Sequence, residues 1–239
     1  MANAYFQFKR FTVFQDRCAM KVGTDGVLLG AWTPVETSHS ILDVGSGTGL
    51  LALMLAQRAP AAEITGVEID QEAWLQSKEN VHQSPWADRI QMVNEDFRPF
   101  SRAGKRHYDL IVSNPPYFMN SKPSSTEARS VARHTSMLSY GELLEGVLRL
   151  LKPAGRFSII LPAQNHPIFS DQAVNVGLFE IRRMLVYPTP QKPVTRILSV
   201  WSQQETDGCN EEKMVLEVTG RHDYSAAYLS LTRDFYLKA

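Results

Sequence analysis

Ile41-Leu-Asp-Val-Gly-Ser-Gly-Thr-Gly-Leu50 is an apolar strand pattern that runs into a glycine-rich turn. A helical pattern follows from Leu50 to Arg58, with apolar residues on successive turns. Strand, glycine turn and helix in this order form the first unit of a Rossmann-like fold, in which the glycines permit positive φ and let a ligand approach the backbone closely. The stretch therefore predicts an α/β fold that binds a nucleotide-like ligand at this turn.

The glycine spacing and an acid before the turn indicate which ligand fits. Gly45, Gly47 and Gly49 follow the order G-x-G-x-G, whereas dinucleotide sites use G-x-G-x-x-G, and Asp43 stands just before them. A dinucleotide site holds a pyrophosphate anion at the helix N-terminus, and an acid there would repel it. A cofactor with an ammonium and a sulfonium suits the acid, so we expect S-adenosylmethionine (SAM). On this motif alone, a dinucleotide oxidoreductase remains an alternative.

A second acid follows at a spacing typical of a ribose contact. Ile64–Asp70 reads as the second strand, and Glu68 ends its apolar run 19 residues after Gly49. An acid near this offset can bind both hydroxyls of a ribose. We assign that role to Glu68, and we expect Asp70 to cap a helix over Gln71–Gln83.

A third acid follows the next predicted strand, which covers Ile90–Phe97. Asp96 is expected to accept a hydrogen bond from the adenine amine of the cofactor. Phe97 is expected to pack against the adenine ring. The alternative for Asp96 is a solvated loop acid.

The tetrapeptide Asn114-Pro115-Pro116-Tyr117 follows a strand-like run, Tyr108–Ser113, and suits methyl transfer to a planar NH2 nitrogen. The lone pair of such a nitrogen is delocalised, so the nitrogen is a poor nucleophile. The Asn114 amide oxygen and the Pro115 carbonyl can accept its hydrogens and draw the lone pair out of conjugation. Neither proline has an N–H and both φ angles are fixed, while Tyr117 offers a face for stacking. The alternative is a rigid turn at a strand end.

These motifs together resemble class I SAM-dependent methyltransferases of the NPPY type. The resemblance rests on four successive segments, namely Asp43–Gly49, Glu68, Asp96 and Asn114–Tyr117. It implies a Rossmann-like α/β fold with a mostly parallel seven-stranded sheet and helices on both faces. It also implies SAM as the cofactor and Asn114, Pro115, Pro116 and Tyr117 as the catalytic turn.

The N-terminal region narrows the resemblance. Phe8–Phe14, Lys21–Trp32 and Ala132–His134 are similar to segments of the bacterial tRNA adenine-N6 methyltransferases, which modify the adenosine beside the anticodon of valine tRNA. The similarity covers nearly the whole chain and implies a tRNA substrate. It also implies that the segment around Lys21 and Thr24 contributes to the wall of the cofactor pocket.

Length and composition fit an enzyme of modest size. The chain has 239 residues with 44% hydrophobic content, and we expect one domain over residues 1–239 with an N-terminal extension over about 1–38. No apolar run approaches the ~18 residues of a membrane span, and the first residues lack a signal-peptide pattern. Cys18 and Cys209 lie far apart and read as free thiols, so we expect a cytoplasmic protein without a metal site.

Net charge is zero, so an RNA substrate must be argued from how the charges are distributed. Basic residues outnumber acids from Arg98 to His134, on both sides of the predicted catalytic turn. We expect a phosphate backbone to lie there when a nucleotide is extruded into the pocket. The alternative is a set of solvated loop charges. The polar segment Asn120–Thr135 is the expected mobile lid or substrate loop. We assign His134 within it to a substrate or surface contact, and a role as a base is the alternative.

The rest of the sequence predicts helices and strands that support the site. A helix is expected over Tyr140–Leu151, ended by Lys152–Gly155, and a second over Asn165–Val176. The expected strands are Arg156–Leu161, Leu178–Tyr187, Arg196–Ser202 and Lys213–Val218. Alternating strands and helices imply a parallel sheet, joined by an antiparallel strand at the end.

The sequence thus favours N6-methylation of an adenosine in tRNA and leaves several alternatives open. A protein methyltransferase that modifies a glutamine amide is one, although such enzymes usually carry a separate N-terminal helical domain and only 40 residues precede Ile41 here. DNA adenine-N6 and rRNA guanine-N2 methylation are others. A nucleotide-binding module without catalysis is the alternative outside the enzymes.

Overall fold

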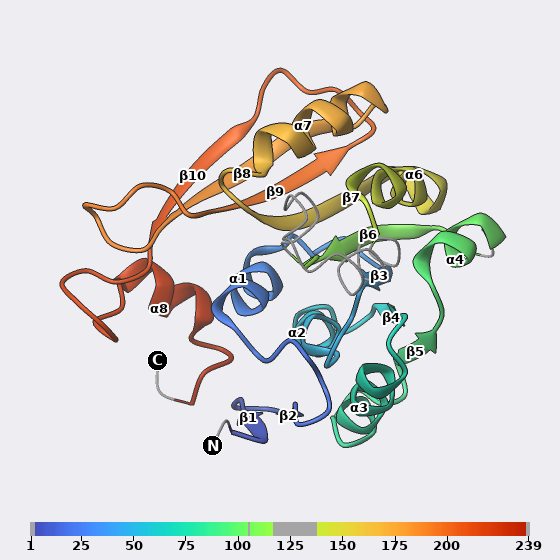
Figure 1. Cartoon of the computed structure of the whole chain (residues 1–239), viewed down its shortest axis with the longest axis horizontal. Coiled ribbons are helices and arrows are strands. Elements are labelled where there is room, and N and C mark those ends of the chain that lie inside the picture. The colour runs from blue at the N-terminus through green and yellow to red at the C-terminus, as the bar shows by residue number, and fades with distance from the viewer. Residues whose placement is uncertain (1–2, 105, 117–137, 238–239) are drawn as a thin grey trace, which may run out of the picture.

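The computed structural model describes residues 3–104, 106–116 and 138–237. Helices and strands alternate along most of this part of the chain (Figure 1). In chain order the elements are β1 (Tyr5–Gln7), β2 (Thr12–Phe14), α1 (Thr24–Trp32), β3 (Ser40–Val44), α2 (Leu50–Arg58), β4 (Glu63–Glu68), α3 (Gln71–His82), β5 (Ile90–Asn94), α4 (Phe97–Ala103), β6 (Tyr108–Ser113), α6 (Tyr140–Leu150), β7 (Leu151–Pro162), α7 (His166–Asn175), β8 (Phe179–Tyr187), β9 (Arg196–Ser202), β10 (Asn210–Val215) and α8 (Ala226–Thr232).

The described residues form a central sheet of eight strands in the order β10-β8-β9-β7-β6-β3-β4-β5. Strand β9 runs antiparallel to both of its neighbours, β7 and β8, and the other pairings are parallel. The strand order reverses between β3 and β6, which are adjacent in the sheet. In open α/β sheets ligands bind at such a reversal, outside the carboxyl ends of the strands.

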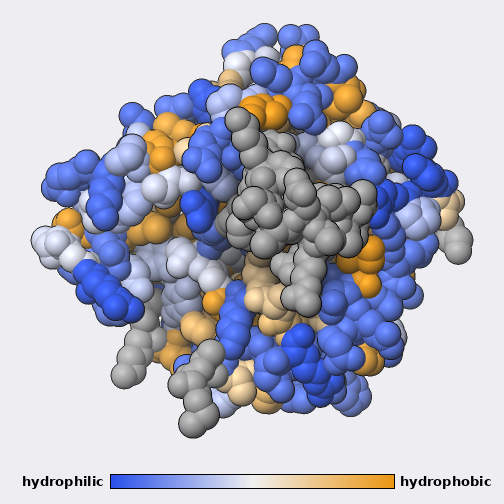
Figure 2. All heavy atoms as spheres, viewed as in Figure 1, coloured by the Kyte–Doolittle hydropathy of each residue, from blue (hydrophilic) through white to orange (hydrophobic). Residues whose placement is uncertain are grey.

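Two hydrophobic layers cover the two faces of this sheet. Alternate residues of a strand point to opposite faces, so Ile41 of β3 packs into one layer and Leu42 into the other. Helices α1 and α2 bury their apolar residues on the Ile41 face, and α6 and α7 do so on the Leu42 face. Figure 1 shows the two groups of helices on either side of the sheet. The face in Figure 2 is mostly hydrophilic, with separate smaller hydrophobic patches.

The N-terminal segment is built into the same core. Phe8, Phe11 and Val13 belong to the buried cluster that contains α1 and α2. The Lys9 backbone N–H donates to the Phe235 carbonyl over 2.8 Å, so the two ends of the chain lie side by side (Figure 1).

The structure corrects several predicted elements. The described residues form a central sheet of eight strands rather than the seven that the resemblance implied, and its last strand, β10, joins β8 in parallel rather than antiparallel. This last strand covers Asn210–Val215, three residues earlier than predicted. Residues 152–155, predicted to end a helix, lie within β7, where the pairing with β6 shifts register between Tyr108 and Leu110.

Helix α1 was not predicted. Its sequence, TDGVLLGAW, contains two glycines and is buried on all sides from Gly26 to Trp32. A helix that is buried all round shows no amphipathic period, and glycine lowers helix propensity. Packing against α2 and the sheet overrides both signals in the folded chain.

Candidate functional site

The glycine turn and the Asn-Pro-Pro turn follow neighbouring strands and lie at the same edge of the sheet, namely the one formed by the carboxyl ends of the parallel strands. Val44, the last residue of β3, pairs with Ser113, the last residue of β6. The Ser113 hydroxyl donates to the Val44 carbonyl over 3.0 Å. The next residues in each strand are Gly45 and Asn114, so the hydrogen bond fixes the starting points of both turns relative to each other.

Backbone hydrogen bonds hold the glycine turn against the end of β4. The N–H groups of Gly45 and Ser46 both donate to the Val67 carbonyl, over 2.9 and 3.1 Å. Gly45, Gly47 and Gly49 have φ angles of 71°, 52° and 80°, which side chains with a Cβ rarely adopt. A Cβ at Gly45 or Gly47 would meet no atom of the described residues within 4 Å. Both glycines therefore border open space, as a turn that receives a ligand requires.

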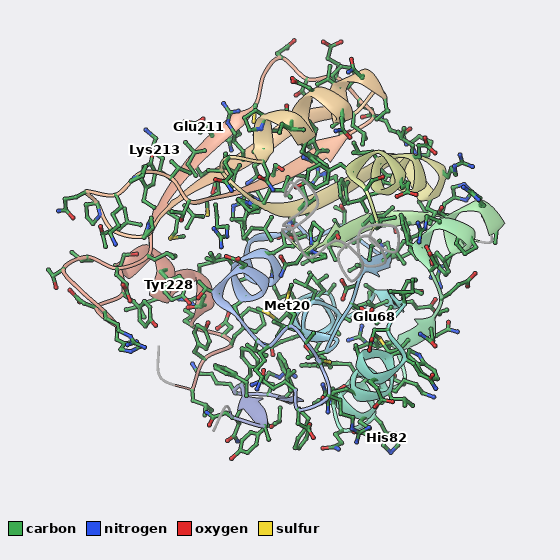
Figure 3. All side chains as sticks on the ribbon, in the orientation of Figure 1. Met20, Glu68, His82, Glu211, Lys213 and Tyr228 are labelled. Carbon is green, nitrogen blue, oxygen red and sulfur yellow. The ribbon has the colours of Figure 1, made fainter. Side chains whose placement is uncertain are left out.

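Glu68, the last residue of β4, is 8% exposed and lies at the edge of the sheet that holds the glycine turn (Figure 3). Its Oε2 accepts the Gly47 N–H over 2.8 Å, and its Oε1 accepts the Asp70 N–H over 2.9 Å. Each carboxylate oxygen retains a second lone pair. Glu68 thus ties the turn to the following helix, α3, and the ribose contact remains a prediction.

Asp43 is fully buried, and only one of its oxygens is satisfied. Its Oδ2 accepts the Ala52 N–H over 3.2 Å, whereas Oδ1 has no hydrogen-bond partner among the residues that the structure describes. Burial raises the pKa of Asp43 to about 7, the Ala52 N–H opposes this rise, and the negative charge of Glu68 adds to it. An unsatisfied buried carboxylate oxygen is costly and calls for an explanation such as a missing ligand.

These observations fit the cofactor that the sequence indicates. A cationic group near the turn would favour the ionised form of the buried Asp43 and would meet a second acid, Glu68. The open space beside Gly45 and Gly47 would admit the cofactor backbone. The residues present therefore suit a molecule with an ammonium and a sulfonium.

The N-terminal segment crosses this edge of the sheet and is held by two buried amides of α3. Asn80 accepts the Phe14 N–H over 2.8 Å and donates to the carbonyls of Phe14 and Thr48, each over 2.9 Å. Gln76 accepts the Arg17 N–H over 2.8 Å. Asn80 thereby joins the N-terminal segment to the glycine turn. This link was not predicted from the sequence.

Cys18 lies on the same segment and is electrostatically coupled to the acids of the site. Burial, together with the negative charges of Glu68 and Asp70, raises the pKa of its thiol to about 11. The thiol therefore stays protonated at neutral pH. Lys21 and Thr24, predicted to line the pocket wall, follow on this segment and are exposed. Their contact with a cofactor remains a prediction.

Asp96 caps α4 and pairs with Arg98. Its Oδ1 accepts the Arg98 N–H over 2.8 Å, and both of its oxygens accept the Arg98 guanidinium. Hydrogen bonding by the Arg98 side chain holds the pKa of Asp96 below its ordinary value. Phe97 is 5% exposed and packs in the core, where a Cβ at Gly146 of α6 would lie 2.4 Å from its ring. The adenine contacts assigned to both residues remain predictions.

The Asn-Pro-Pro turn lies against the first turn of α1. Asn114 is partly buried, Pro115 is buried and Pro116 is exposed. A Cβ at Gly26 of α1 would lie 3.8 Å from Asn114 Nδ2 and 2.9 Å from Leu50 Cδ2. Glycine at position 26 thus lets α1 approach the turn. Tyr117, His134 and the loop Asn120–Thr135 lie outside the described residues.

The basic stretch predicted to flank the catalytic turn is divided by the fold. Arg98 is committed to Asp96 and Glu142. Arg106 pairs with Glu63, the first residue of β4, over 2.7 Å. Parallel strands begin at one edge of the sheet and end at the other, so Arg106 lies at the edge opposite Asn114. The expectation that Arg106 faces the substrate is therefore corrected, and the expectation for the other basic residues of the stretch stays a prediction.

The described ranges, 3–104, 106–116 and 138–237, contain no group of three or more histidine, cysteine, aspartate or glutamate side chains placed to hold a metal ion. Within the same ranges, every helix falls short of the length and apolarity needed to cross a bilayer.

Comparison with known proteins agrees with this geometry. Residues 18–165 match the family described as the methyltransferase small domain. The tRNA1(Val) (adenine(37)-N6)-methyltransferase of Bacteroides fragilis strain YCH46 is 51% identical over 239 residues and covers 100% of both chains. The protein of the same name from Trichodesmium erythraeum is 43% identical over 240 residues, again with 100% coverage of both chains.

Solved structures share the fold. A predicted O-methyltransferase from Agrobacterium tumefaciens superposes with a TM-score of 0.68 at 18% identity, covering 88% of this chain and 96% of that one. A putative RNA methyltransferase from Pyrococcus horikoshii gives a TM-score of 0.52 at 19% identity, covering 73% of this chain and 80% of that one. At such identities the likeness establishes the Rossmann-like fold alone. The matched family and the full-length relatives establish more: the chain belongs to the methyltransferase small domain family and, within it, to the tRNA1(Val) (adenine(37)-N6)-methyltransferases.

Proposed function

We propose that this chain transfers a methyl group from SAM to N6 of adenine 37 in tRNA1(Val), in the cytoplasm. Full-length relatives at 43–51% identity carry this activity in their names. The substrate base lies in the anticodon loop, where a nucleotide can be extruded into a pocket at modest cost because it is not held in a duplex.

The single observation that carries the proposal is the placement of the two turns. The Gly45 turn and the Asn114 turn leave adjacent strands at paired residues, Val44 and Ser113, which also share a hydrogen bond. A cofactor beside the glycine turn and a base at the Asn-Pro-Pro turn would therefore lie next to each other. Methyl transfer needs this proximity, since the two reacting atoms must come within about 3–3.5 Å.

Asn114 and Pro115 act on the target amine. The Asn114 amide oxygen and the Pro115 carbonyl accept its two hydrogens and orient its lone pair away from the ring. These bonds strengthen as positive charge develops on the nitrogen, so they favour the transition state over the ground state. Pro115 and Pro116 fix the turn, and Tyr117 supplies the stacking face.

Asp43 and Glu68 hold the cofactor. When bound, SAM supplies a methyl group that its sulfonium already activates. Asp43 would attract the ammonium of the cofactor, and Glu68 would accept hydrogen bonds from the ribose hydroxyls. Asp96, Phe97, Lys21 and Thr24 complete the predicted pocket. The work of the chain is positioning and the exclusion of water.

Transfer of radiolabelled methyl from SAM to separate tRNA, rRNA, DNA and protein fractions tests the proposal. We expect label in tRNA. Label in a protein fraction would instead support glutamine methylation, and label in rRNA or DNA would support guanine-N2 or DNA adenine-N6 methylation. SAM binding without transfer to any fraction would support a binding module.

A further inference from the structure

Helix α1 is held by a polar contact at each end. At its first turn, Asp25 Oδ2 accepts Arg196 Nε over 2.9 Å. At its last residue, Trp32 Nε1 donates to Glu212 Oε2 over 3.2 Å. Arg182 also pairs with Glu212 and stacks 4.3 Å over the Trp32 ring. Asp25 and Trp32 are seven residues apart in this helix, so these two anchors are about 10 Å apart along its axis.

The end held by Asp25 is the one that meets the catalytic turn. Gly26, the next residue, lies beside Asn114, as its Cβ position 3.8 Å from Asn114 Nδ2 shows. Gly23, the residue that precedes α1, supplies no side-chain cap to the first turn. The ion pair with Arg196 is therefore an anchor that fixes this turn against the sheet.

Arg196 connects that anchor to the strands that carry the site. It is the first residue of β9 and pairs with Pro162, the last residue of β7. β7 in turn pairs with β6, which ends at Ser113 just before Asn114. The Asp25–Arg196 pair thus links α1 to the same edge of the sheet from which the catalytic turn leaves.

We propose that Asp25 and Arg196 are positioning residues that set the Asn114 amide for methyl transfer. This inference rests on the proposed function. The backbone of Asn114 is restricted by the prolines that follow it, so its amide is adjusted by what packs against it. Displacement of α1 by a fraction of an ångström would move that packing surface, and misplacement of about 1 Å at a reacting centre can cost 10²-fold in rate.

The Arg182–Glu212 pair is a matched control. Its side chains are 31% and 31% exposed, against 31% and 23% for Arg196 and Asp25. It holds the same helix at the end away from Asn114, through a hydrogen bond and a stacking contact with Trp32. A loss of stability alone would act through both pairs alike.

The experiment compares Asp25→Asn and Arg196→Gln with Glu212→Gln and Arg182→Gln. Each variant is measured for single-turnover methyl transfer, SAM affinity by calorimetry and melting temperature. In Asp25→Asn and Arg196→Gln we expect the rate of transfer to fall about tenfold or more, with SAM affinity within about twofold of wild type. In the control pair we expect the rate of transfer to stay within about twofold of wild type. The double variant Asp25→Asn/Arg196→Gln should be no slower than the singles, and Arg196→Lys should recover part of the rate.

Normal transfer in Asp25→Asn and Arg196→Gln would overturn the inference. Equal losses in the control pair would do so as well, because they would show that the helix acts only through stability. Additive losses in the double variant would show that the two residues act separately. If the wild-type chain methylates another nucleic acid, the proposed function fails, and the same variants on that substrate still test the inference.

Discussion

Two aspartates on neighbouring strands of this sheet differ in how many hydrogen-bond partners the protein gives them. Asp109, near the start of β6, accepts hydrogen bonds from the His39 and Ser40 backbones, the Ser40 hydroxyl and Lys152 Nζ. Asp43, near the end of β3, accepts one backbone N–H and keeps a buried oxygen that has no partner among the described residues. The described residues satisfy both oxygens of the first carboxylate and only one oxygen of the second.

The pKa values of the two carboxyl groups diverge for the same reason. Burial would raise the pKa of Asp109, but hydrogen bonds from Lys152 and Ser40 outweigh it and hold the value below the ordinary range. Burial raises the pKa of Asp43 to about 7, and among the described residues only the hydrogen bond from the Ala52 N–H opposes this rise. Hydrogen bonds within the protein thus satisfy the carboxylate at the edge where β6 begins, whereas the proposed function places a ligand at the edge where β3 ends. Changes at the first edge should affect stability, and changes at the second should affect function.

The largest functional effect is expected at Asn114. Asn114→Ala should lower single-turnover methyl transfer at least about a hundredfold, because it removes an acceptor for the charge that develops on the amine. SAM affinity should stay within several-fold of wild type. Quenched single-turnover assays with labelled SAM measure the rate of methyl transfer. A near-normal rate would reduce the Asn-Pro-Pro turn to a structural feature.

Asp109→Ala should produce the opposite profile. Removal of this carboxylate leaves the His39 and Ser40 N–H groups and Lys152 without their acceptor, so we expect a loss of about 1–3 kcal/mol in the free energy of unfolding. Methyl transfer at saturating substrate should be unchanged. Urea denaturation followed by fluorescence gives the stability. Impaired methyl transfer in a stably folded Asp109→Ala variant would contradict the claim that this edge affects only stability.

The pH dependence of SAM binding should reveal the ionisation of Asp43. Its folded-state pKa lies above the ordinary value of 3.8, so the free protein holds a proton there between about pH 4 and 7. A cationic ligand favours the ionised form, and the proton is released on binding. Affinity should therefore rise about tenfold from pH 6 to pH 8, the change expected for one group with a pKa near 7. Calorimetry in buffers of different ionisation enthalpy detects the proton.

Asp43→Asn is the control for this titration. The variant should bind SAM weakly at every pH and show no rise between pH 6 and 8. Stability should move in the other direction in the free wild-type chain, because a raised folded-state pKa makes stability fall as pH rises from about 4 to 7. A wild-type affinity that is flat across this range would contradict the role of Asp43.

The smallest effect is expected at Arg106. It pairs with Glu63 at the edge opposite Asn114, so Arg106→Glu should leave tRNA affinity and its salt dependence unchanged. Binding assays between about 50 and 200 mM salt provide the comparison. A flattened salt slope would mean that tRNA reaches around to this edge.

The sequence predicted the parts of this molecule that follow local rules. The strand–glycine–helix unit at Ile41–Arg58 and the cap at Asp70 are confirmed, with the Asp70 side chain accepting the Ala73 N–H over 2.8 Å. Such features arise from short-range backbone chemistry, which a single sequence displays. The chemical suitability of Asn114 for an amine is likewise visible in the residues themselves.

Contacts between distant segments escaped prediction. Asn80 bonds Phe14 across 66 positions, and Asp25 pairs with Arg196 across 171. Nothing in the local pattern of either residue marks its partner. The same limitation led Arg106 to be assigned to the substrate, since adjacency in sequence does not reveal which edge of the sheet a side chain occupies.

Methylation of two tRNA1(Val) transcripts that differ only at adenine 37 tests the central claim most directly. One transcript keeps this adenine and the other carries guanine. After reaction with labelled SAM, each is digested to nucleosides and the labelled product is identified. The account predicts N6-methyladenosine from the first transcript and no label in the second. Equal label in both transcripts, or label in any other nucleoside, would contradict it.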